Sequence, residues 1–322
     1  MLWHIHILIS NRFGHSIVGY SMIFEVVIRV FLLITISIIG WGVGKKFELD
    51  SKDISTLLVY IISPFVIFYS IIESPANWTY LKFSLGAFLL ASFMAVAGLL
   101  FARCFWKDSR VNLFGFAAGT GNTGYFALPL ILAIFDKTQI AMAIFIIIGI
   151  NLYEFTVGYL ITAKGSLNIK ESILKAIKMP ILYAAFLGMI FKYLDIQFDE
   201  VFLSFLANFK GAYSVLGMMT IGITIAKFSK IEIDWLFSVL ALAWKHLIYP
   251  VFGILIFMFI FPVNKQILQI VALMVATPMA GNVVVISNTL GLHPEKAATS
   301  VMLSTMLALI TVPIALFFVM KF

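Results

Sequence analysis

Residues 119–129 read Gly-Thr-Gly-Asn-Thr-Gly-Tyr-Phe-Ala-Leu-Pro, and residues 276–282 read Ala-Thr-Pro-Met-Ala-Gly-Asn. Each stretch interrupts a long apolar segment with glycine, asparagine and proline, which weaken or break a helix. In hydrocarbon, broken backbone persists only where protein, water or a ligand satisfies its polar groups. Two such breaks at comparable depth therefore indicate a binding site, whereas a single one would be an ordinary kink.

The composition around these breaks indicates a membrane protein. Of 322 residues, 62% are hydrophobic and 11% are charged, whereas a soluble domain carries about 25% charged residues. This balance excludes a soluble enzyme, a disordered regulator and a disulfide scaffold, and the single Cys104 can form no internal bridge. The sequence contains no P-loop, no His-Glu-x-x-His pair and no Gly-x-Ser-x-Gly elbow.

Ten apolar stretches are long enough to cross a bilayer, which requires about 20 residues. The short-period alternation of a membrane barrel is absent, so the prediction is an all-α polytopic membrane protein with ten transmembrane helices. The ten spans cover residues 22–43, 55–73, 83–105, 112–135, 139–162, 174–194, 202–226, 235–260, 266–290 and 296–319.

Lysine and arginine are distributed unevenly between alternate connections. The connections after odd-numbered spans hold 13 of these residues and the other side holds 6, leaving out Arg29, Lys210 and Lys245 within spans. The positive-inside rule then predicts that the first set is cytoplasmic and that both termini lie outside, in a cell inner or plasma membrane. Topology thus explains most of the net charge of +7, and nucleic acid is not expected as a partner.

The ten spans divide into two halves of five. Residues 1–21 form a stub, interfacial or untranslated, and Met22 is an equal candidate for the start. Residues 22–162 would be the first repeat and 163–322 the second, inverted because each contains an odd number of spans. A shift of 156 residues lays Asn122 on Pro278, so both breaks fall at matching positions. Paired half-helix N-termini near the midplane would make a pocket suited to an anion.

The run Asn122-Thr123-Gly124-Tyr125-Phe126-Ala127-Leu128-Pro129 resembles the fourth-helix signature of the auxin efflux carrier family. The tract from Thr277-Pro278 through Gly291-Leu292-His293-Pro294 to Leu303-Ser304-Thr305-Met306 is similar to that family's ninth and tenth helices. Plant members carry the ninth-helix crossover proline where Val283 stands here, so the break is expected nearer Pro278.

This resemblance implies an inverted-repeat fold similar to that of bile-acid sodium symporters. Helices 1, 2, 6 and 7 would form a scaffold, and helices 3–5 and 8–10 a mobile transport core with crossed broken helices 4 and 9. Alternating access would be elevator-like. The implied substrates are small organic anions such as malate- or malonate-like carboxylates, with no cofactor, no metal and no enzymatic activity.

Candidate site residues cluster at the two breaks. The family's matching asparagine implies that Asn122 holds substrate, although the same side chain could cap the second half-helix. Asn282 could be its counterpart, and Thr123 and Tyr125 could contact substrate or only line the pocket. The helix-break and crossover positions are Gly121, Gly124, Pro129, Pro278 and Gly281.

Ionisable residues inside spans usually face the protein interior. Glu154 in the fifth span and Lys245 in the eighth could form an ion pair used for coupling or gating, or a static pair. His246 is predicted to be a packed residue with its hydrogen bonds satisfied. No carboxylate lies between Gln266 and Leu290, which argues against sodium coupling of the bile-acid type.

The leading functional prediction is a secondary-active or uniport carrier of small organic anions. A proton- or sodium-coupled symporter of another solute on the same fold is the alternative, and a membrane enzyme or sensor using Glu154, Lys245 and His246 is a remote one. Substrate identity, transport direction, protons as coupling ions and a homodimer are left open at this point.

Overall fold

The computed structural model describes residues 35–162, 180–226, 233–260 and 264–321, together with residues 28, 31, 32, 174, 177 and 178. All regular structure in these ranges is helical. The stub predicted at residues 1–21 and the junction of the two predicted repeats near residue 163 lie outside the described residues.

The chain forms a series of helices, several of which are interrupted by a π-helical turn. An unlabelled helix covers residues 35–47. The others are α2 (Ser51–Leu57), η1 (Leu58–Ile62), α3 (Ser63–Ile72), η2 (Trp78–Tyr80), α4 (Leu81–Ala102), α5 (Arg110–Gly119), η3 (Thr123–Ala127), α6 (Leu128–Ile134), α7 (Lys137–Tyr153), η4 (Glu154–Gly158), α8 (Tyr159–Thr162), α10 (Pro180–Tyr193), α11 (Glu200–Ala226), α12 (Trp235–Ala243), η5 (Trp244–Ile248), α13 (Tyr249–Ile260), α14 (Lys265–Val275), α15 (Asn282–Leu290) and α16 (Pro294–Lys321).

Helix α4 has the two faces expected of a helix between protein and lipid. Phe83, Leu90 and Met94 are buried on one side, whereas Leu89 and Phe93 on the other are at least half exposed. Large apolar side chains exposed along a whole helix would destabilise a soluble protein, but they suit contact with acyl chains.

Helix α7 lies at the centre of the bundle. Every residue from 139 to 150 is buried, on all sides of the helix. A helix that is apolar all round must be surrounded by other elements, and α4, α6, α14 and α3 pack against this one.

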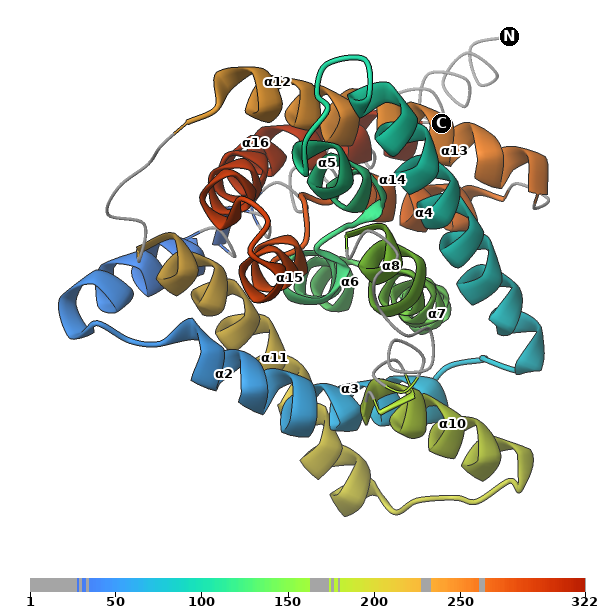
Figure 1. Cartoon of the computed structure of the whole chain (residues 1–322). Coiled ribbons are helices and arrows are strands. Elements are labelled where there is room, and N and C mark those ends of the chain that lie inside the picture. The colour runs from blue at the N-terminus through green and yellow to red at the C-terminus, as the bar shows by residue number, and fades with distance from the viewer. Residues whose placement is uncertain are drawn as a thin grey trace, which may run out of the picture.

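The helices form two groups (Figure 1). Helices α2, α3, α10 and α11 pack against one another on one side of the molecule, and α4–α8 with α12–α16 form the other group. Contacts between the groups include α11 against η3 and α6, and α3 against α7. The expected division into a scaffold of helices 1, 2, 6 and 7 and a mobile transport core stays a prediction.

Four helical stretches in the described residues are long and apolar enough to cross a membrane by themselves. They are Trp78–Ala102, Lys137–Thr162, Glu200–Ile223 and Trp235–Phe259, and a fifth is added if the bent α16 counts as one span. Other predicted spans consist of shorter helices or of two helices separated by a break. The chain is therefore a multi-pass membrane protein, while the count of ten spans and the inverted repeat stay predictions.

Connections predicted to lie on the same side of the membrane contact one another. The first contacts join the connections at the ends of even-numbered spans. Lys137 Nζ lies 2.7 Å from Glu73 Oε2, and Gln266 Nε2 donates to Asp136 Oδ2 at 3.0 Å. Residues 108–110, 234 and 293–296, which follow odd-numbered spans, form a second cluster. Helix α4 runs between the two clusters, and its 22 residues span about 33 Å.

Candidate functional site

The first broken helix is interrupted between α5 and η3. Helix α5 ends at Gly119, and Thr120 takes an extended conformation with φ −84° and ψ 162°. The Oδ1 atom of Asn122 accepts a hydrogen bond from the Tyr125 N–H at 3.2 Å, so this side chain caps the second half-helix. Pro129 lies in the first turn of α6, where a missing N–H is tolerated.

The second broken helix has a similar construction. Helix α14 ends at Val275 and α15 begins at Asn282, so the interruption contains Pro278 and Gly281. Thr277 Oγ1 donates to the Met274 carbonyl at 2.8 Å. In the first break, Thr120 Oγ1 donates to the Ala117 carbonyl at 3.0 Å, again three residues back. A threonine thus satisfies a helix-terminal carbonyl at both interruptions.

The two breaks meet in space. The Asn122 N–H donates to the Pro278 carbonyl at 2.8 Å, joining positions 156 residues apart in sequence. Gly121 lies directly beside the other break, because a Cβ atom on it would fall 2.7 Å from Thr277 Oγ1. Broken backbone from one helix is therefore satisfied in part by broken backbone from the other, as the low-dielectric interior requires.

Glu154 and Asn282 contact each other at this crossing. Asn282 Nδ2 donates to Glu154 Oε2 at 2.6 Å, while the buried Glu154 Oε1 has no hydrogen-bond partner in the part of the chain that the structure describes. The Glu154 carboxylate also lies near the Gly121 backbone amide. The amide of Asn282 is therefore engaged by a protein carboxylate, and the carboxylate keeps one oxygen available.

Lys245 is buried beside the first break. It is 1% exposed, and its Nζ atom has no hydrogen-bond partner among the described residues. The ammonium lies 3.9 Å from the centroid of the Tyr249 ring and 3.3 Å from the position of a Cβ on Gly121. An aromatic face attracts a cation but does not replace its hydrogen bonds.

The direct ion pair that the sequence suggested is not formed. Within the described part of the chain, no Lys245 nitrogen lies within 4.0 Å of a Glu154 oxygen. The reason is local: Asn282 holds the Glu154 carboxylate, while Lys245 is directed toward Gly121 and Tyr249. Both residues lie in π-helical turns, η4 and η5, a distortion that is frequent at functional sites.

His246 is a satisfied buried residue that reaches the second break through a hydroxyl group. Its Nε2 atom is 2.9 Å from Ser304 Oγ, and its Nδ1 atom is 3.0 Å from Thr311 Oγ1. Ser304 Oγ also accepts the Met279 N–H at 2.9 Å. This chain of hydrogen bonds connects the backbone of the break to α16.

Three of the candidate positions lie where the first break faces α11. Thr123 is buried, and Gly124 lies near Tyr213, since a Cβ on that glycine would be 3.4 Å from the tyrosine hydroxyl. Tyr125 is half-buried, and its backbone oxygen is 3.5 Å from a Cβ placed on Gly217. The second half of the first break thus lies against α11, whereas Lys245 and Glu154 lie near Gly121 of the same break.

Sequence reasoning missed Thr277, Ser304 and Tyr249. A signal existed for the first of these, because a shift of 157 residues, instead of 156, lays Thr120 on Thr277. No comparable pattern marks Ser304 or Tyr249, whose roles depend on how α16 and α13 pack against the break.

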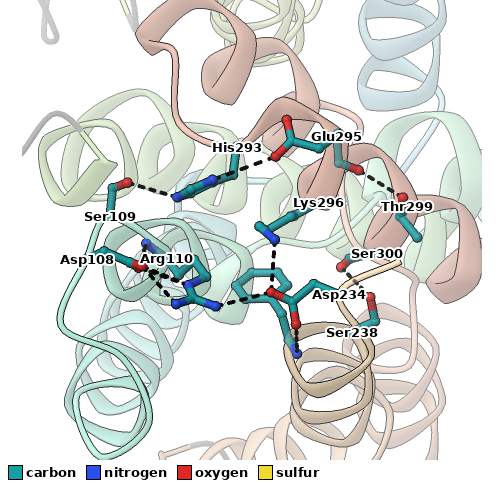
Figure 2. A network of polar contacts seen from close by, with 11 residues as sticks. Asp108, Ser109, Arg110, Asp234, Ser238, His293, Glu295, Lys296, Thr299 and Ser300 are labelled. Carbon is teal, nitrogen blue, oxygen red and sulfur yellow. Dashed lines mark hydrogen bonds and ion pairs between the residues drawn. The ribbon is translucent and has the colours of Figure 1, made fainter. Parts of the chain in front are cut away.

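A second polar group gathers at the end of the bundle where α5, α12 and α16 begin (Figure 2). Asp234 Oδ2 accepts from Lys296 Nζ at 2.9 Å and from Arg110 Nη1 at 3.3 Å, and Arg110 also binds Asp108 at 2.8 Å. Hydrogen bonds from Arg110 lower the pKa of Asp108 to about 2. Burial would raise the pKa of Asp234, but hydrogen bonds from Lys296 and the Phe237 N–H lower it.

A bundle of apolar helices with two interrupted helices joined at their breaks is typical of helical membrane transport proteins. Comparison with known proteins agrees. Residues 166–316 match the model of a family described as membrane transport protein. Over residues 166–316, this match confirms the recognition made from the sequence, which is a resemblance to membrane transporters of the auxin efflux carrier family.

One relative supports the same assignment. An uncharacterized transporter of Methanocaldococcus jannaschii is 24% identical over 236 residues, which cover 70% of this chain and 76% of the relative. This alignment is longer than the 166–316 match, so it also includes part of the first half of the chain.

Proposed function

We propose that this transporter is a secondary-active or uniport carrier of small organic anions, and that the anion binds where the two breaks cross. The observation that carries the proposal is Lys245, a buried ammonium beside Gly121 to which the described residues offer no hydrogen-bond partner. A buried charge is costly unless it is paired, so an arriving carboxylate would supply the partner that is missing among the described residues. A short carboxylate of the malate or malonate kind is the proposed substrate.

Backbone and side-chain donors supplement this charge. Asn122 and Thr123 begin the second half of the first broken helix, whose N-terminus favours anions. Their N–H groups donate to the Pro278 and Gly121 carbonyls, and they would contact an anion only after releasing these partners. Tyr125 and Asn282 are the other proposed substrate contacts, although Asn282 must first release Glu154.

Alternating access would follow from the two helix groups. In this proposal α2, α3, α10 and α11 are a scaffold along which the other group slides, carrying the crossing between the membrane faces. Support comes from the contact of α11 with η3, where Gly217 and Gly124 present backbone instead of bulky side chains. Such a surface resists sliding less than interlocked side chains would.

Glu154 would couple transport to protons in this proposal. Its free oxygen, Oε1, is buried and close to the crossing, so protonation would change the charge balance around Lys245 without moving a helix. Sodium coupling of the bile-acid type is disfavoured because no carboxylate is available between Gln266 and Leu290. Three further parts of the proposal rest on the sequence alone. They are a homodimer, a location in the inner or plasma membrane, and termini outside the cytoplasm.

The test is uptake of labelled malate into proteoliposomes, with and without a pH gradient. We expect saturable flux that Asn122→Ala and Lys245→Met each reduce at least tenfold. The matched controls are Asn77→Ala and Lys82→Met, which make the same changes at exposed positions away from the crossing. An effect of the gradient that disappears in Glu154→Gln would support proton coupling.

Several results would contradict the proposal. Folded wild-type protein without flux would exclude malate as substrate, and equal losses in site and control variants would exclude the crossing as the site. Uptake of a different solute that is driven by sodium or protons would favour the symporter alternative. Turnover of a membrane substrate without flux would favour an enzyme.

A further inference from the structure

A cavity of about 320 Å³ lies at the end of α4, outside the crossing. It is formed by the last turn of α4, the following connection and the first turn of α5, with Arg103, Lys107, Asp108 and Asn112 among its lining residues. Trp106 forms a buried wall, held against Phe114 and Phe237 by ring contacts at 6.0 and 5.5 Å. The wall is therefore rigid, while the basic side chains are exposed.

The charge in this cavity is positive and unpaired. Asp108, its acidic lining residue, is bound by Arg110 at 2.8 Å, and that contact holds the pKa of Asp108 near 2 (Figure 2). Arg110 itself reaches on to Asp234 at 3.3 Å. Among the residues that the structure describes, the side chains of Arg103 and Lys107 have no ion-pair or hydrogen-bond partner. Two cations at one cavity thus lack counter-charges.

The cavity adjoins a surface suited to acyl chains. Leu85, Leu89, Phe93, Val96 and Leu100 lie three or four residues apart along the outer face of α4, and each is about half exposed. From Leu85 to Leu100 this stripe is about 22 Å long, which exceeds half of the roughly 30 Å hydrocarbon core. A lipid with its head group at Arg103 could therefore lay its chain along α4.

From this arrangement we propose that the cavity binds the phosphate head group of an anionic membrane lipid. Arg103 and Lys107 would contact the phosphate, Asn112 and Trp106 would line the glycerol region, and the α4 stripe would hold an acyl chain. Basic pockets between transmembrane helices on the cytoplasmic side are suited to such lipids. A free phosphate would meet the same two cations but would gain nothing from the apolar stripe, so the lipid is the favoured occupant.

The proposal does not depend on the transported solute, because its readout is stability. Purified full-length protein in detergent would be melted with phosphatidylglycerol, with phosphatidylcholine of the same chains, or with soluble glycerol phosphate. The test variant is Arg103→Gln with Lys107→Gln. The matched control is Lys45→Gln with Lys46→Gln, which removes two exposed lysines at the end of the helix at 35–47.

We expect phosphatidylglycerol to raise the melting temperature of the wild type and the control, and to raise that of the test variant by less than half as much. Native mass spectrometry of the wild type should show retained phosphatidylglycerol in preference to phosphatidylcholine, which tests the site even if the variant folds poorly. Equal shifts in both double variants, or no lipid preference, would overturn the proposal. A full shift with glycerol phosphate would identify a soluble anion as the occupant and would also overturn it.

Discussion

The close approach at Gly121 gives a sharp test of the crossing. In Gly121→Ala, the new Cβ would lie 2.7 Å from Thr277 Oγ1, a distance that requires one of the two groups to move. Thr277 is fully buried and its hydroxyl is held by the Met274 carbonyl at 2.8 Å, so it cannot rotate without losing that hydrogen bond. The added methyl group would therefore push the two broken helices apart.

Overpacking of this kind costs about 1–3 kcal/mol. With about 2.1 cal/mol/K of unfolding entropy per residue, a chain of 322 residues would lose about 1.5–4.5 °C in melting temperature. Gly281→Ala is the matched control, because it lies in the other break and no atom is within 4 Å of its Cβ position. That variant should be unchanged or slightly stabilised, since alanine restricts the unfolded chain.

Thermal unfolding of detergent-purified protein, followed by intrinsic fluorescence, would measure both variants. Thr277→Ala in the Gly121→Ala background should recover part of the loss, because the colliding hydroxyl is removed, and a double-mutant cycle would give the coupling. If Gly121→Ala melts at the same temperature as Gly281→Ala, the two breaks do not lie as close as described, and the reasoning fails.

Two further predictions concern the polar contacts around the breaks and at the end of the bundle. Ser304→Ala should cost about 1–3 kcal/mol, because the Met279 N–H loses its acceptor; Ser300→Ala, whose hydroxyl makes only a 3.4 Å contact, should cost less than half of that in the same melting assay. The lowered pKa values of Asp108 and Asp234 predict that their stabilising contribution is complete above the unfolded pKa of about 3.9 and is lost as pH falls toward 2. Asp234→Asn should flatten that part of the stability profile, and an unchanged profile would contradict the network.

The interruptions of the helices could be predicted from the sequence because their causes are local. Pro278 lacks a donor, and the glycines around Asn122 weaken the helix, whatever surrounds them. The predicted capping role of Asn122 is also local, and the structure contains this contact, the acceptance of the Tyr125 N–H. Its role in substrate binding stays a prediction.

The partners of the ionisable residues could not be predicted in the same way. Glu154 and Lys245 are interior residues by their place in apolar spans, but their partners depend on the rotation and depth of four different elements. A residue such as Asn282 can capture the carboxylate at 2.6 Å only because α15 restarts beside η4. Spacing along the chain contains no information about that packing. The sequence therefore suggested Lys245 as the direct partner of Glu154, and this pair is not formed in the structure.

The arrangement around Lys245 also explains why stability and function would make opposite demands in the proposed carrier. Lys245 is 1% exposed, and its ammonium has no hydrogen-bond partner among the described residues, so it is destabilising by itself. A direct bond to Glu154 would remove that cost, but it would also occupy the cation that an arriving anion needs. Because Asn282 holds the carboxylate instead, both groups stay close and incompletely paired, and in the proposed carrier the electrostatic gain would be released when the anion binds.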